Sequence, residues 1–196
     1  MSPDNRKDKI REQPLTYDDY AALPDDGMRY ELVDGVLEAM MPAPSSMHQL
    51  VSFQLQRTIA QSCESDYIIL YAPLDVILSP TEVRQPDLVM VHRSRIDIIT
   101  KRGIEGPPDL VVEILSPYTI KRDRLGKRKT YARYRIPEYW IVDPASASLE
   151  QYVLQDRAYD LFDVYTGDEP VRSDHIPCVS FTMNDVMSRI PDLPDL

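Results

Sequence analysis

The sequence lacks the features that mark membrane and secreted proteins. No apolar run approaches the roughly 20 residues that a membrane-crossing helix needs. Residues 1–14 are charged and polar and lack the apolar segment of a secretory signal. We therefore expect a cytoplasmic protein without a membrane partner.

Cysteine is scarce. Cys63 and Cys178 are the only two, and no CxxC pair is present, so a zinc site or a catalytic cysteine is disfavoured. We expect both thiols to be reduced and structurally unimportant.

The bulk composition is that of a globular protein. The 196 residues are 43% hydrophobic and 28% charged, which is enough to bury a core without disulfides or a structural metal. Residues 1–14 are expected to form a flexible arm, because they are polar and end in Pro14. Residues 15–190 are expected to form a single domain.

Charge is distributed unevenly along the chain. The net charge of −10 disfavours indiscriminate nucleic-acid binding, because Lys and Arg supply the affinity for phosphate. Residues 121–135, however, carry +7, which leaves −17 on the rest. Such a basic segment can meet a polyanion, or it can be simply a solvated helix face.

The pattern of apolar and turn residues predicts a mixed sheet with helices packed against it, an α/β (α+β) fold. Asp34-Gly35 between two alternating segments predicts an N-terminal hairpin, and residues 93–106 resemble a loop with one helical turn. Helices are expected from Thr16 to Leu23, from Ser45 or Ser46 to about 62, at 122–135 and at 182–188. Strands are expected at 29–33, 36–41, 67–78 with Pro73 interrupting or edging it, 87–91, 109–115 and 138–143, and in a C-terminal antiparallel extension at 149–154, 158–165 and 176–181.

Two carboxylates on these strands are candidates for metal chemistry. Glu113 lies inside a run of Val, Ile and Leu, where a charge is costly unless it is paired, protonated or bound to metal. Asp87 stands at the start of another buried strand. If the strands are neighbours, a divalent cation would relieve the repulsion, and such oxygen ligands suit Mg²⁺ or Mn²⁺. Alternatively, Glu113 forms a core ion pair with Arg or Lys, and Asp87 caps loop amides.

Several segments, in their order and spacing, resemble one family. They are RYELVDG at 29–35, a Pro/Ser stretch ending in His48, PDLVMV at 86–91, PDLVVEILSP at 108–117, the D-x3-K-x3-Y spacing of Asp123, Lys127 and Tyr131, and IPEYWIVDP at 136–144. The chain resembles the Uma-type "putative restriction endonucleases", a branch of the PD-(D/E)XK nuclease superfamily, over about residues 15–185. The resemblance implies a restriction-endonuclease-like core and metal-dependent cleavage of nucleic acid, DNA in the first place.

The resemblance also implies site residues. Glu31, Asp87 and Glu113 match the acidic positions of the family. The lysine expected two residues after Glu113 is replaced by Leu115, so Lys127 from the following helix is its candidate substitute. Asp123, Lys127 and Tyr131 are four residues apart and would share one helical face, although a surface Asp–Lys pair is the alternative.

The implied cofactor is Mg²⁺ or Mn²⁺, held by Asp87, Glu113 and the carbonyl of Ile114, with Glu31 acting through water or on a second ion. Lys127 would donate to the nucleophile or to the oxyanion, with Tyr131 orienting it or simply packing. Flanking phosphates would be bound by Arg122, Arg124, Arg128 and Lys129. His48 would contact phosphate or act in the site.

Three alternatives or additions stay open. An inactive nuclease fold could serve as a nucleic-acid-binding or assembly module, since Leu115 departs from the family pattern. A metal-free hydrolase could use the two carboxylates on another substrate such as a sugar. A homodimer is expected, because two sites are a simple route to cutting both strands, and residues 149–180 could supply its interface.

Overall fold

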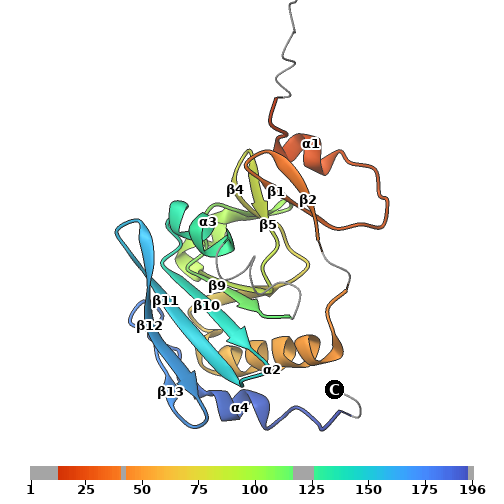
Figure 1. The fold of residues 1–196 in the computed structure, drawn as a ribbon. Helices are drawn as coiled ribbons and strands as arrows, with labels where there is room; N and C mark the ends of the chain where they lie inside the picture. The colour runs from red at the N-terminus through yellow and green to blue at the C-terminus, as the bar shows by residue number, and fades with distance from the viewer. Residues whose placement is uncertain (1–12, 41–42, 117–125, 194–196) are drawn as a thin grey trace, which may run out of the picture.

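The computed structural model describes residues 13–40, 43–116 and 126–193, and two six-stranded sheets form its framework. The N-terminal sheet has the order β2-β1-β5-β4-β8-β7, and the central sheet has the order β12-β11-β10-β9-β6-β3 (Figure 1). The N-terminal sheet consists of β1 (Tyr30–Val33), β2 (Val36–Ala39), β4 (Val76–Ser79), β5 (Glu82–Arg84), β7 (Ile99–Thr100) and β8 (Gly103–Glu105). The central sheet consists of β3 (Tyr67–Tyr71), β6 (Leu88–His92), β9 (Leu110–Ile114), β10 (Glu138–Asp143), β11 (Ser148–Gln155) and β12 (Ala158–Thr166).

Both sheets are mixed, as the sequence predicts. Strands β4 and β8 run parallel, as do β9 and β10, and the other neighbours are antiparallel. Parallel neighbours need a crossover connection, and the link from β9 to β10 contains the short helix α3 (Arg128–Arg133). The predicted single central sheet is therefore two sheets, and the N-terminal hairpin is the edge of the first rather than an appendage.

The predicted hairpin turn is confirmed. Asp34 and Gly35 have φ values of 49° and 78°, the pair of positive angles that a type I′ turn requires. Gly35 also has Pro14 close beside it, where a Cβ atom would collide. The Gly35 carbonyl accepts a 2.9 Å bond from the Leu15 amide, so this turn anchors the segment that leads into the fold.

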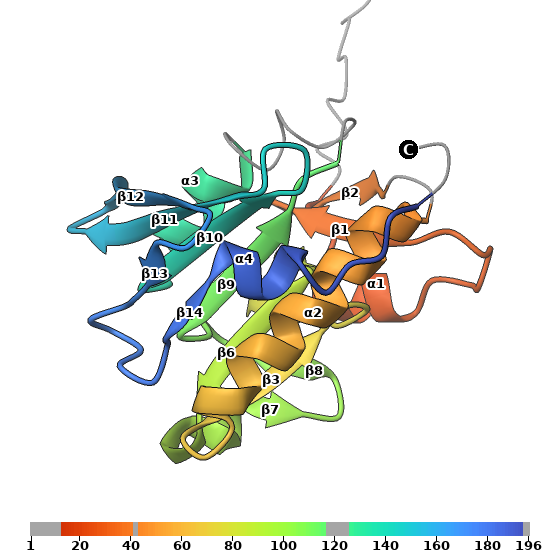
Figure 2. The same ribbon diagram turned by 90° about the horizontal axis from the view of Figure 1, so that it is seen from below.

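Helices α2 (Ser46–Cys63) and α4 (Met183–Met187) cover one face of the central sheet (Figures 1 and 2). Ser45, one of the two residues at which this helix is expected to begin, caps α2 by accepting a bond from the His48 amide. A short helix, α1 (Tyr17–Ala21), also begins where expected, with a capping box between Thr16 and Asp19. No helix among the described residues combines the length and apolarity needed to cross a membrane.

Helix α3 and part of the N-terminal sheet cover the opposite face of the central sheet. Alternation along β9 places Val112 and Ile114 in the core under α2, and Val111 in the core under α3. Strands buried on both faces are apolar throughout, which explains the unbroken Val/Ile/Leu runs. By the same alternation, Glu113 points to the α3 side.

Three expectations about secondary structure are wrong in part. The strand expected at 67–78 is two strands, β3 and β4, that belong to different sheets. Segment 176–181 is mostly turn; only Phe181–Thr182 forms a strand (β14), paired with β13 (Pro170–Val171). The apolar residues of this segment still reach the core: Ile176 and Val179 are buried although they lie in a turn, in which the Val179 amide donates to the Ile176 carbonyl. Segment 93–106 contains, besides the helical turn η1 (Arg93–Ile98), the strands β7 and β8.

The expectation of two reduced thiols is also wrong. Cys63, at the end of α2, forms a disulfide with Cys178, and their Cα atoms are 5.1 Å apart. The two residues are 115 positions apart in the sequence, so spacing alone carries no sign of the contact. The fold brings them together because both pack into the core beneath α2.

We predict that this disulfide stabilises the fold. Cys178→Ala is expected to lower the free energy of unfolding by about 2–4 kcal/mol, because the cross-link restricts the unfolded chain. Urea denaturation with and without reductant measures the effect. Reductant should destabilise the parent but not the variant; two titratable thiols in the parent under oxidising conditions would contradict the prediction.

Candidate active site

Asp87 stands immediately before β6, and Glu113 lies on β9, the antiparallel neighbour of β6. Leu88 of β6 pairs with Val112 of β9, so one further step of the register places Asp87 opposite Glu113. Both residues therefore stand at the same end of the β6–β9 ladder, and Asp87 contacts the amide of Ile114, the neighbour of Glu113.

Two elements hold the Asp87 side chain. Its Oδ2 accepts a 2.7 Å bond from the Ile114 amide and lies 3.2 Å from His48 Nε2. Among the described residues, both partners contact Oδ2 and none contacts Oδ1. The Asp87 side chain is 19% exposed. Oδ1 is thus the oxygen that can serve a ligand. His48 lies in the site, as one of its two predicted roles requires, and its 7% exposure gives it little reach towards phosphate.

Glu113 contacts two side chains from the crossover after β9. Its Oε1 accepts a 2.8 Å bond from Lys127 Nζ and another of 2.8 Å from the Tyr131 hydroxyl. Glu113 and Lys127 are only 3% and 2% exposed. Lys127 and Tyr131 share a face, as predicted, since both contact Glu113. Lys127 is buried rather than on the surface, and its predicted partner Asp123 lies outside the described residues.

Glu31, on β1, joins the same group of charges. Its Oε1 lies 3.5 Å from Lys127 Nζ and accepts a 2.9 Å bond from the Gln85 amide. Its Oε2 lies 3.3 Å from Arg84, the residue opposite it on β5. Because Lys127 contacts Glu31 of the N-terminal sheet and Glu113 of the central sheet, its ammonium group links the two sheets.

Arg84 and Glu82 extend this buried network and were not among the residues predicted from the sequence. Arg84 donates to Glu82 at 2.6 Å and to Thr130 of α3 at 3.2 Å. Both charged residues are almost fully buried, with 3% and 0% of their surfaces exposed. The alternation of Glu82, Val83 and Arg84 in a short strand is a usable signal, because it places two charges on one face.

The network fixes protonation states. Burial opposes the charge of Arg84, but Glu31 and Glu82 outweigh it and raise the pKa of the guanidinium. Burial, followed by the charge of Glu113, raises the pKa of Tyr131 well above its usual value. Tyr131 therefore remains a neutral hydroxyl that donates to Glu113.

Leu115 occupies the position where the resemblance expects a lysine, and it packs in the core at 5% exposure. Lys127 supplies the ammonium group instead, at hydrogen-bonding distance from Glu113. Asp123, Arg122 and Arg124 lie outside the described residues. Arg128 and Lys129 open α3 and are partly or fully exposed.

The donor chemistry fits a hard divalent cation. Asp87 and Glu113 offer carboxylate oxygens, and Ile114 offers a backbone carbonyl beside them. No cluster of three or more His, Cys, Asp or Glu side chains suited to a metal occurs among the described residues. Mg²⁺ does not need such a cluster, because it is commonly held by one or two carboxylates and keeps several waters.

The architecture and the site together define a class of protein: a mixed-sheet nuclease-like fold with carboxylates at the end of adjacent strands and a buried lysine at the start of α3. Comparison with known proteins agrees. A family model described as Uma2, "Putative restriction endonuclease", matches residues 17–184. The chain belongs to this family, whose description is that of a nuclease.

A solved structure shares the fold. The crystal structure of a "putative nuclease" from Anabaena variabilis matches with a TM-score of 0.70 and 20% identity, covering 89% of this chain and 98% of the other. No functionally curated protein matches. The family and the fold predicted from the sequence are thus both confirmed.

Proposed function

We propose that this chain is a metal-dependent endonuclease that hydrolyses phosphodiester bonds of nucleic acid, DNA in the first place. The observation that carries the proposal is the buried Lys127, whose ammonium group lies 2.8 Å from Glu113 although Leu115 fills the usual lysine position. A lysine held beside a metal-ligand carboxylate can serve the reaction from either position in the sequence.

Each residue has a defined task in this proposal. Asp87, Glu113 and the Ile114 carbonyl would hold Mg²⁺ or Mn²⁺, which lowers the pKa of a bound water and neutralises charge on the phosphate. Lys127 donates a hydrogen bond to the attacking or developing anionic oxygen. Its partners hold it in place: Glu113 on one side and Glu31 on the other. The main task of Glu31 in this proposal is therefore to position Lys127.

His48 and Tyr131 position the two carboxylates Asp87 and Glu113. His48 contacts Asp87 Oδ2 and, together with the Ile114 amide, fixes which carboxylate oxygen faces a ligand. Tyr131, kept neutral, donates to Glu113 and limits its rotation. Arg128 and Lys129 would bind phosphates beside the site without reading base sequence. A homodimer is part of the proposal, because two copies can cut both strands.

The experiment is a nicking assay on supercoiled plasmid DNA, with an RNA substrate in parallel. Parent protein is expected to nick DNA with Mg²⁺ or Mn²⁺ and to stop in EDTA. Asp87→Ala and Glu113→Gln define the background, and Asp97→Ala, at an exposed acidic residue of η1, is the matched control.

Other outcomes separate the alternatives. Equal activity in the parent, Asp87→Ala and Glu113→Gln would eliminate the proposed site. DNA binding without cleavage under any metal would favour a nucleic-acid-binding or assembly module, for which Leu115 in the core is the supporting observation. Hydrolysis that survives EDTA would favour metal-free carboxylate chemistry.

A further inference from the structure

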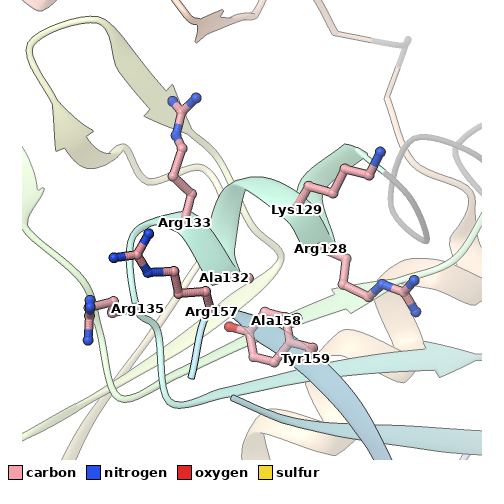
Figure 3. A pocket seen from close by; sticks show the side chains of 8 residues that line it. All are labelled: Arg128, Lys129, Ala132, Arg133, Arg135, Arg157, Ala158 and Tyr159. Atoms are coloured by element: carbon pink, nitrogen blue, oxygen red, sulfur yellow. The ribbon is translucent and has the colours of Figure 1, made fainter. Parts of the chain in front are cut away.

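A basic pocket lies beside α3, next to the face that carries Lys127 and Tyr131. Its volume is about 690 Å³, and its cations are Arg128, Lys129, Arg133, Arg135 and Arg157. Tyr159 and two alanines form the apolar part of the lining (Figure 3). We name these residues the basic pocket.

Most of these cations have no carboxylate partner among the residues that the structure describes. Arg133 forms ion pairs with Asp34 and Glu82. Of the other four, none forms an ion pair with a carboxylate in the described part of the chain, and the lining contains no acidic residue. The protein as a whole has a net charge of −10, so this local group of cations is unusual in it. The cations repel one another, and this repulsion destabilises the folded protein. A bound anion would relieve it.

The arrangement of the charges suits an extended polyanion. Figure 3 shows the Arg133 side chain pointing away from those of Arg128 and Lys129, with Arg135 and Arg157 on a third side. The positive ends thus spread apart rather than converge on one point. One phosphate group could contact only some of them, whereas a chain of phosphates could contact them in succession. Duplex DNA carries about six charges in 10 Å of its axis, so its backbone offers phosphates in close succession.

One cation comes from a segment far away in the sequence. Arg157 lies in the two-residue turn between β11 and β12, where Gln155 pairs with Ala158. The basic run at 121–135 gives no sign of it. Arg128 of α3 also contacts this hairpin, because its guanidinium lies 5.2 Å from the ring centroid of Tyr152 on β11. The hairpin and α3 therefore form one surface.

We propose that the basic pocket binds the phosphodiester backbone of the nucleic acid on one side of the active site. The proposal rests on the proposed function in taking nucleic acid as the partner. Helix α3 connects the two places: Lys127 and Tyr131 contact Glu113, and Arg128 and Lys129 open onto the pocket. A strand held in the pocket would therefore lie against the same helix whose Tyr131 contacts Glu113.

The test measures binding without cleavage. The dissociation constant of a 20-base-pair DNA duplex with 5′-hydroxyl ends is measured in EDTA by fluorescence anisotropy over a range of salt concentrations. Parent protein is compared with Arg135→Gln/Arg157→Gln. The matched control, Lys101→Gln/Arg189→Gln, removes the same charge from the β7–β8 turn and from the segment after α4.

The expected result is a change in salt dependence. Loss of two phosphate contacts lowers the slope of log affinity against log salt by about two in the pocket variant, since each contact contributes about 0.9. The control keeps the parent slope. Equal slopes in all three proteins would overturn the proposal even if the parent cleaves DNA. Conversely, an altered slope in a protein that never cleaves would leave the pocket standing and remove the nuclease function.

Two further arms identify the anion. The first arm uses a duplex with 5′-phosphates. If Arg135→Gln/Arg157→Gln weakens binding of this duplex but not of the 5′-hydroxyl duplex, the pocket recognises a terminal phosphate, and backbone binding is overturned. Poly-L-glutamate binding through the same residues without any DNA binding would overturn nucleic acid as the partner. Thermal melts of each variant confirm that the comparison concerns folded proteins.

Discussion

Lys127→Met is expected to lower the rate of metal-dependent cleavage by about 10²–10³-fold, the effect of removing one donor to a developing oxyanion. The reason is positional: the Lys127 ammonium contacts both Glu31 and Glu113, so its place beside the reaction is fixed by two carboxylates. Methionine keeps much of the volume but no donor. Single-turnover nicking at saturating Mg²⁺ measures the loss.

Folding must be separated from chemistry in this experiment, because removing the cation leaves two buried carboxylates. Lys127→Arg retains the charge, and its fold is expected to survive, while its planar group cannot place a point charge in the same way. Lys101→Met, at an exposed lysine, is the matched control. Parent-like cleavage by folded Lys127→Met would show that Lys127 is only a counter-ion.

The sequence predicts the parts of this site that local patterns record. Glu113 within an apolar strand signals a carboxylate that needs a partner, and strand alternation sends it to one face. The i,i+4 spacing predicts that Lys127 and Tyr131 share a face, and the structure shows both on Glu113. Asp87 owes its prediction to the family resemblance, because an aspartate after proline is common at strand starts.

Non-local pairing limits what the sequence can reveal. Arg84 contacts Glu31 because β1 and β5 are neighbours, and no pattern in either strand determines that pairing. The same holds for the disulfide of Cys63 and Cys178 and for Arg157 in the basic pocket. The split of residues 67–78 between two sheets is a tertiary choice as well, since both halves have the same strand-forming composition.

Arg84 is the residue whose loss should damage the fold most. Arg84→Met is expected to lower the free energy of unfolding by about 3–5 kcal/mol, because it leaves Glu31 and Glu82 buried without this cation. Both carboxylates are 0% exposed, and both accept charge-assisted bonds from Arg84. The variant also loses the bond to Thr130, which ties β5 to α3.

Urea denaturation of Arg84→Met and of a surface counterpart tests this expectation. Arg102 pairs with Asp18 at 3.0 Å and lies over the Tyr17 ring, but its side chain is 46% exposed and that of Asp18 is 89% exposed. Solvent screens such a pair, so Arg102→Met should cost about 1 kcal/mol or less. Similar losses in the two variants would mean that the buried network does not depend on Arg84. A loss confined to Arg84→Met, together with weaker cleavage by the protein that remains folded, would show that the N-terminal sheet positions Lys127 through Glu31.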